Sequence, residues 1–149
     1  MKYLLDASAL LPLITTHGKQ LITEASRQNL FTIDLAIYEA CNTLWKLSTL
    51  LKSITPNDAE NVATTLKDVI THGIIQSINY AELDLLSTLR LAHQRNLTFY
   101  DTSYIVTAKN AEAIFVTDDE KLRKIAKKYV KATTYTDFER KLTTELQEK

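Results

Sequence analysis

Glycine is almost absent from this sequence, with only Gly18 and Gly73 in 149 residues. Phosphate-binding loops and dinucleotide-binding turns each need several closely spaced glycines, because the backbone must approach the phosphates without a side chain between them. The sequence therefore excludes nucleotide-binding sites of these two kinds.

Cysteine and long apolar runs are scarce as well. Cys41 is the only cysteine, so no internal disulfide can form and a disulfide-stapled secreted domain is excluded. Met1 leads directly into a predicted strand rather than a signal peptide, and no apolar run reaches the length of a membrane span. We therefore expect a soluble cytoplasmic protein that does not enter a membrane.

Net charge is the third absence, because 18 acidic residues balance 18 basic ones. This balance argues against a protein that binds nucleic acid through bulk positive charge. It does not exclude nucleic acid, since a bound metal ion can supply positive charge locally. The length and the apolar content of 45% predict one folded domain.

Predicted strands and helices alternate along the chain. Short β-prone runs lie at residues 2–5, 30–33, 74–78, 113–116 and 130–135. Helical patterns lie at residues 7–13, 19–27, 36–52, 56–71, 80–95, 102–110, 120–129 and 137–147. Residues 15–18 are expected to separate the first two helices. The alternation predicts an α/β fold with three layers, α/β/α, around a mainly parallel central sheet.

The predicted helix at residues 36–52 has an apolar stripe and a polar line. The stripe is expected to be buried and contains Ile37, Cys41, Leu44, Leu47, Leu50 and Leu51. Cys41 is then a small core residue. Glu39 lies off the stripe, in line with Asn42, Thr43 and Lys46. Trp45 and the tyrosines are expected to be core or dimer contacts rather than platforms for stacked bases.

Acidic residues recur at related positions. Asp6 and the pair Asp118–Asp119 follow predicted strands, Asp101 begins a predicted helix, and Glu39 lies early in another. Because ligands bind at the carboxyl edge of parallel strands, we expect these carboxylates to meet there. Clustered carboxylates repel one another unless a cation intervenes, and oxygen ligands without histidine or cysteine suit Mg²⁺ or Mn²⁺. The chemistry indicated is metal-assisted hydrolysis of a phosphodiester.

Each acidic residue also has an ordinary structural explanation. Asp6, Asp101 and either Asp118 or Asp119 could cap the N-terminus of the helix that follows. Glu39 could be a solvated helix residue. The order of all four positions, rather than any one of them, favours a shared site.

Four segments resemble the motif blocks of PIN-domain proteins. They are residues 6–8, 38–46, 100–104 and 116–122, and they occur in that family's order over essentially the whole chain. The likeness is closest to the VapC toxins of prokaryotic toxin–antitoxin pairs. The resemblance implies a single PIN-like domain over residues 1–149 that acts as a Mg²⁺- or Mn²⁺-dependent endoribonuclease.

The same resemblance implies roles for individual residues. The metal-binding and catalytic acids would be Asp6, Glu39, Asp101 and Asp119. Supporting roles would fall to Ser8, Thr117 and Asp118. Two adjacent acids leave open which of Asp118 and Asp119 faces the ion, because successive side chains point in different directions. The family pattern favours Asp119. It also implies a homodimer and a small antitoxin that inserts a segment into the site.

Basic residues follow the last acidic pair and have two interpretations. Lys121, Arg123, Lys124, Lys127, Lys128 and Lys131 are either a rail for RNA phosphates or, preferably, a solvated helix face. Lys46 could contact RNA phosphate or pair with an acid. Two alternative functions also stay open: a housekeeping RNA-processing PIN nuclease, and a non-catalytic α/β signalling or binding domain.

Overall fold

A parallel sheet forms the centre of the computed structural model, which describes residues 1–23 and 29–147. Its strands are β1 (Lys2–Leu5), β2 (Asn29–Ile33), β3 (Ile75–Ile78), β4 (Ile114–Val116) and β5 (Ala132–Thr133). They are arranged in the order β3-β2-β1-β4-β5, and every neighbouring pair is parallel. From β1 the chain adds β2 and β3 on one side and then β4 and β5 on the other side. The carboxyl ends of β1 and β4 therefore border a point where the strand order reverses, which is where open α/β sheets bind ligands.

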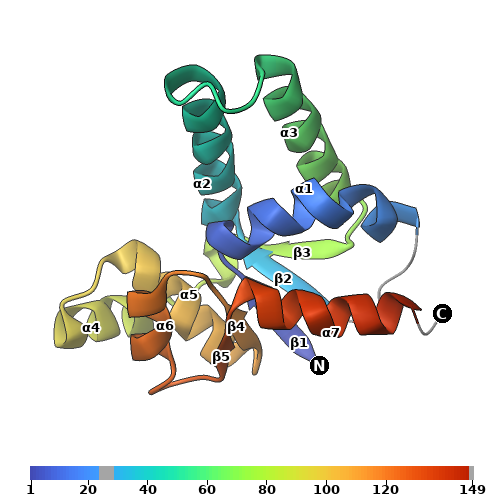
Figure 1. Cartoon of the computed structure of the whole chain (residues 1–149). Helices are drawn as coiled ribbons and strands as arrows, with labels where there is room; N and C mark the ends of the chain where they lie inside the picture. The colour runs from blue at the N-terminus through green and yellow to red at the C-terminus, as the bar shows by residue number, and fades with distance from the viewer. Residues whose placement is uncertain (24–28, 148–149) are drawn as a thin grey trace.

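Helices cover both faces of this sheet (Figure 1). The described helices are α1 (Ala7–Thr23), α2 (Asp34–Trp45), α3 (Pro56–Thr71), α4 (Leu85–Arg95), α5 (Phe99–Asn110), α6 (Glu120–Ala126) and α7 (Tyr135–Gln147). The ring of Tyr3 in β1 packs edge-on against Phe138 of α7 with centroids 4.9 Å apart. On the other face, Tyr104 of α5 stacks on Phe115 of β4. The predicted three-layer α/β/α fold is confirmed.

The helices α2 and α3 stand side by side and extend away from the sheet as an arm (Figure 1). The π-helical turn η1 (Lys46–Leu50) continues α2 at the far end of this arm. The stripe predicted on this helix is wrong in part, because Cys41, Leu50 and Leu51 are exposed. Leu50 and Leu51 lie at the far end of the arm, beyond the sheet, whereas Cys41 lies midway along α2.

The predicted interruption at residues 15–18 is wrong, because α1 continues from Ala7 to Thr23. Gly18 is buried at a close approach to α3. A Cβ at this position would lie 2.5 Å from Cγ2 of Thr65. The glycine therefore permits tight packing between two helices rather than ending one. The predicted helix at residues 19–27 lies partly outside the described residues.

Several boundaries in the second half of the chain differ from prediction. A 3₁₀ turn η2 (Tyr80–Glu82) precedes α4, because the Asp84 carboxylate caps α4 by accepting the Ser87 N–H. Helix α5 begins at Phe99, so Asp101 lies in its first turn and Thr98, not Asp101, is the N-cap. The last strand is two residues long, shorter than predicted.

Aromatic residues divide between the core and the surface. Tyr3, Tyr104 and Tyr135 are buried, as expected for core residues. The expectation of a core position is wrong for Trp45 and for the tyrosines Tyr38, Tyr80 and Tyr100, which are 50–76% exposed. A role of these exposed rings in a dimer stays a prediction. Within the described part of the chain, no helix has both the length and the apolar character required to cross a bilayer.

Candidate functional site

Asp6 lies at the carboxyl end of β1 and is only 6% exposed. Its backbone N–H donates to the Val116 carbonyl, which fixes the ends of β1 and β4 beside each other. Its Oδ1 atom accepts the Ala9 N–H at 3.1 Å and the Ser8 hydroxyl at 2.6 Å. Asp6 therefore caps α1 while remaining at the sheet edge where the sequence predicted a site.

The electrostatic environment of Asp6 disfavours its charged form. Burial raises the pKa of this carboxyl to about 6, and the nearby negative charge of Glu39 adds to the rise. Hydrogen bonds from Ser8, Thr117 and the Ala9 backbone oppose it. A buried carboxylate beside another acid is a group that a bound cation would stabilise.

Glu39 approaches Asp6 from helix α2. Its side chain is exposed, and its Oε1 atom accepts the Tyr104 hydroxyl at 2.6 Å. Tyr104 belongs to α5, one turn after Asp101. The sequence predicted Tyr104 only as one of the tyrosines expected in the core or at a dimer contact. Its spacing from Asp101 was the available signal, because residues three apart share one face of a helix.

Asp101 and Asp119 form a second acidic pair. The pKa of Asp101 is raised by burial and by the negative charge of Asp119, against the effect of a hydrogen bond involving Thr98. Both residues line a small cavity of about 160 Å³, which Lys121 also borders. The Oδ1 atom of Asp119 accepts the Leu122 N–H at 3.0 Å and so caps α6.

Asp118 faces a different part of the molecule from Asp119. Its Oδ1 atom accepts the Tyr135 N–H at 2.9 Å, at the start of α7. Asp119 instead borders the cavity that it shares with Asp101. The two adjacent carboxylates therefore diverge, as expected for successive residues leaving a strand.

Two hydroxyl groups join the ends of β1 and β4. The Ser8 hydroxyl donates to Asp6 and its oxygen accepts the Asp118 N–H at 2.9 Å. It lies 3.5 Å from the hydroxyl of Thr117, which accepts the Asp119 N–H at 3.1 Å. A continuous chain of hydrogen bonds thus connects the segment that carries Asp6 with the segment that carries Asp118 and Asp119.

The four predicted acids are arranged as two pairs, Asp6 with Glu39 and Asp101 with Asp119. Over residues 1–23 and 29–147, no three acidic, histidine or cysteine side chains converge into a ready-made ion site. Repulsion between carboxylates opposes such convergence when no cation lies between them. The donor set consists of carboxylate oxygens, which fits a hard divalent ion such as Mg²⁺ or Mn²⁺.

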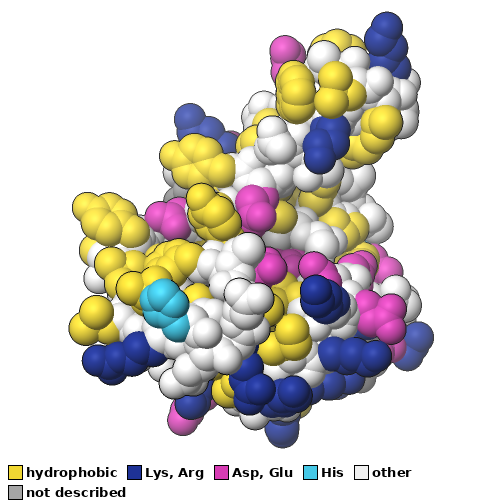
Figure 2. All heavy atoms as spheres, turned by 90° about the vertical axis from the view of Figure 1, so that its left-hand side faces the viewer, with side chains coloured by type: hydrophobic (Ala, Val, Ile, Leu, Met, Phe, Trp, Pro, Cys, Tyr) yellow, Lys and Arg dark blue, Asp and Glu magenta, His cyan; other side chains and the backbone are white. Residues whose placement is uncertain are grey.

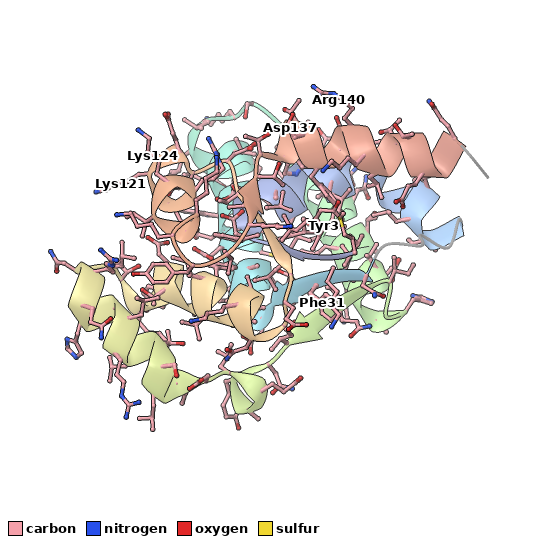
Figure 3. All side chains as sticks on the ribbon, turned by 90° about the horizontal axis from the view of Figure 1, so that it is seen from below. Tyr3, Phe31, Lys121, Lys124, Asp137 and Arg140 are labelled. Atoms are coloured by element: carbon pink, nitrogen blue, oxygen red, sulfur yellow. The ribbon has the colours of Figure 1, made fainter. Side chains whose placement is uncertain are left out.

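The predicted basic residues lie at different distances from these acids. Lys121 borders the cavity of Asp101 and Asp119, and both Lys121 and Lys124 extend outward from α6 (Figure 3). Lys46 is exposed on the arm, two turns along from Glu39. Lys131 borders a separate cavity of about 570 Å³ that holds none of the four acids. Figure 2 shows acidic side chains across the middle of one face and basic side chains along its lower border.

The sequence is similar to those of known proteins. A family model described as "PIN domain" matches residues 3–128. A protein of Pyrobaculum aerophilum named exonuclease VapC9 is 35% identical over 122 residues, which cover 82% of this chain and 84% of that protein. Ribonuclease VapC3 of the same organism is 32% identical over 127 residues, which cover 82% of this chain and 92% of that protein.

Solved structures show the same fold. The crystal structure of PAE2754 from Pyrobaculum aerophilum has a TM-score of 0.72 and 31% identity, covering 97% of this chain and 99% of that one. VapBC-1 from nontypeable Haemophilus influenzae has a TM-score of 0.60 at 14% identity, with 91% and 99% covered. VapBC2 from Rickettsia felis, bound to a promoter DNA fragment, has a TM-score of 0.54 at 17% identity, with 90% and 98% covered. The last two likenesses concern the fold alone.

Proposed function

This chain belongs to the PIN-domain family, and on that premise we propose that it is a Mg²⁺- or Mn²⁺-dependent endoribonuclease. The main support is the pair Asp6 and Glu39, with Asp6 at the end of β1, together with the pair Asp101 and Asp119, with Asp119 following the neighbouring strand β4. The names of the two curated relatives, an exonuclease and a ribonuclease, support a nuclease activity. The oxygen-only donor set supports the choice of ion.

In this proposal Asp6, Glu39, Asp101 and Asp119 hold the ion and with it the scissile phosphate. When bound, the ion supplies positive charge to the phosphate and lowers the pKa of the attacking water. Asp6 is held in place by Ser8 and the Ala9 N–H. Asp119 is oriented through its Oδ1 atom by the Leu122 N–H, which leaves its second oxygen outside this cap.

Neighbouring residues have supporting roles in the proposal. Ser8 and Thr117 orient the ends of β1 and β4 through their hydroxyl groups. Asp118 stabilises the start of α7 rather than holding the ion directly. Lys121 is the basic residue best placed to contact a phosphate, because it borders the same cavity as Asp101 and Asp119. Lys46 is a second and more distant candidate on the exposed side of the arm.

We further propose that the protein is the cytoplasmic toxin of a toxin–antitoxin pair, acts as a homodimer and is inhibited by a small antitoxin. The VapC names of both relatives and the two VapBC structures support this proposal. The surface also offers apolar side chains for protein contacts, including Trp45, Leu50 and Leu51 on the arm and Leu85, Leu86 and Leu89 on α4. Hydrophobic side chains gather at the projecting upper part of the molecule in Figure 2. Exposed apolar patches of this kind commonly mark protein-binding surfaces.

One experiment tests the activity and its mode together. Purified protein is incubated with a linear and a circular RNA, with Mg²⁺, with Mn²⁺ or with excess EDTA. We expect both RNAs to be cut, and cutting to stop in EDTA. Asp6→Asn is the inactive control. Undiminished cleavage in EDTA would contradict the metal dependence.

The circular RNA separates two modes of cleavage. An exonuclease needs an end and leaves a circle intact, whereas an endonuclease opens it. Shortening of the linear RNA with an intact circle would make this chain an exonuclease, as the name of one relative suggests for that protein. It would leave the proposed site unchanged but would overturn the endonucleolytic mode.

A further inference from the structure

We propose that the Tyr104 hydroxyl is the positioning group of the metal centre, holding the Glu39 carboxylate beside Asp6 before the ion binds. This inference rests on the proposed function, because it assigns a role within the same site. It concerns a residue whose ring is buried in the core and whose hydroxyl reaches the acids.

Glu39 needs an external restraint more than two of the other acids do. Oδ1 of Asp6 is held by the Ala9 N–H, and Oδ1 of Asp119 is held by the Leu122 N–H. Glu39 has a longer side chain on an exposed helix position, and ordering such a side chain costs rotamer entropy. Its Oε1 atom accepts the Tyr104 hydroxyl at 2.6 Å, a length typical of a strong bond from a hydroxyl to a carboxylate.

Tyr104 is itself firmly fixed. Only 2% of the residue is exposed, and its ring stacks on Phe115 with centroids 5.8 Å apart and planes 13° apart. Phe115 lies in β4, two residues before Thr117, and the Ala7 backbone is within hydrogen-bonding reach of the tyrosine oxygen. A single side chain therefore touches the β1–α1 junction, α2 and β4 while belonging to α5. These are the segments that present the four acids.

The Tyr104 hydroxyl is the donor in its bond to Glu39, because a carboxylate oxygen accepts hydrogen bonds. In the proposal Tyr104 is therefore a hydrogen-bond donor to a ligand and not itself a ligand. Its contribution is orientation, which the chain can lose without losing a metal ligand.

Tyr104→Phe tests this role because it removes the hydroxyl and keeps the stacked ring. Mn²⁺ binding to the RNA-free protein is measured by isothermal titration calorimetry. Loss of a group that orients a ligand typically weakens metal binding about tenfold to a hundredfold, and we expect a loss in this range. Saturating Mn²⁺ should then restore most of the cleavage rate, because no ligand is missing.

Tyr135→Phe is a matched control. The Tyr135 hydroxyl also donates to a glutamate, Glu139, at 2.6 Å, but outside the acidic site. We expect this variant to bind Mn²⁺ as the wild type does. A difference between the two variants therefore reports position in the site rather than loss of a buried hydroxyl in general.

The remaining outcomes are decisive. Unchanged Mn²⁺ affinity in Tyr104→Phe, or equal weakening in Tyr135→Phe, would overturn the role of Tyr104 and leave the proposed function standing. A Tyr104→Phe protein that fails to fold while Tyr135→Phe folds would assign Tyr104 to the core and overturn the inference. Absence of Mn²⁺ binding by the wild type would overturn the metal centre and this inference with it.

Discussion

Among single residues, Asp6 has the most direct effect on stability. Its pKa is raised from 3.8 to about 6, mainly by burial, so between these pH values the folded protein keeps a proton that the unfolded chain has released. The free energy of unfolding of the metal-free protein therefore falls as the pH rises through this window. The pKa shift corresponds to a loss of about 3 kcal/mol in the free energy of unfolding. This loss is complete above pH 6 and absent below pH 4.

Asp6→Asn should remove this destabilisation and also abolish cleavage. Asparagine can still accept the Ala9 N–H but has no charge to bury. In EDTA at pH 8 we expect the melting temperature to rise by several degrees, and at pH 4 to change little. Differential scanning calorimetry at the two pH values gives the comparison. A melting temperature below that of the wild type at pH 8 would show that the charged carboxylate is net stabilising.

Asp118 and Asp119 should respond differently to the same substitution. Asp119→Asn is expected to reduce cleavage by at least about tenfold, because it removes a carboxylate beside Asp101. Asp118→Asn should reduce it less, since its side chain contacts the Tyr135 N–H and asparagine can keep that bond. Mn²⁺ titration of both variants measures the same order without RNA. If Asp118→Asn is the more damaging by both measures, the ligand lies one residue earlier.

Sequence reasoning named the four candidate acids but did not single out Tyr104, which we propose orients Glu39. The acids follow apolar strands or begin helices, and these local patterns are visible without a fold. The contact between Glu39 and Tyr104 joins residues 65 positions apart. It depends on how α2 and α5 meet at the sheet edge, which no local pattern records.

At the scale of whole elements, helix α1 shows how tertiary packing overrides local preference. Glycine disfavours a helix interior by about 1 kcal/mol relative to alanine, which is why Gly18 predicted an interruption. The helix continues because α3 packs closely against it at this position. By contrast, α3 begins at Pro56, as the sequence predicted, and Thr55 and Asp58 form a capping box at this end. Caps depend on residues three apart and are therefore more predictable than contacts between helices.

Gly18→Ala should destabilise the protein despite the better helix preference of alanine. The new Cβ would lie 2.5 Å from the Thr65 methyl group. The hydroxyl of Thr65 donates to the Asn61 carbonyl, which holds this side chain in its rotamer. We expect the free energy of unfolding to fall by about 1–3 kcal/mol, the usual cost of overpacking, in a urea titration.

The background Thr65→Ser provides the control for this prediction. Serine keeps the hydroxyl and lacks the methyl group, so the clash should disappear. In this background Gly18→Ala should be neutral or stabilising, because only the helix preference remains. Equal destabilisation in both backgrounds would mean that the Thr65 methyl group is not the cause.

The predicted stripe on α2 failed for a reason that belongs to the same scale. Helical spacing predicts which residues share a face, and within the predicted stripe it is correct for Leu44, which is buried. Spacing does not say how far the opposing layer extends. Past Leu44 the arm leaves the sheet, and Leu50 and Leu51 remain exposed.

For the whole molecule, acidic and basic residues are equal in number but lie in different parts of the surface. Acidic side chains occupy the middle of the face in Figure 2, and basic ones border it below. RNA contact would then rely on a few lysines and a bound ion rather than on net attraction. A chain with no net charge is therefore compatible with RNA binding.

The toxin proposal is tested by expression in cells. Expression of the wild-type protein should slow growth, because RNA cleavage would proceed unchecked. Asp101→Asn should be harmless, because it removes a carboxylate of the second acidic pair. Growth curves and protein levels measured side by side give the result. Normal growth of the native host with abundant active enzyme and no antitoxin gene would favour a housekeeping nuclease.

The central position of β1 has a consequence for the order of events during synthesis. This strand is made first, yet one of its two neighbours, β4, begins at Ile114. At about 5–20 residues per second, the ribosome produces Asp119 roughly 6 to 23 seconds after Asp6. Throughout that interval one flank of β1 has no partner and the set of four acids is incomplete. A chain that ends before Ile114 therefore lacks both the β4 neighbour of β1 and one of the four proposed acids, Asp119.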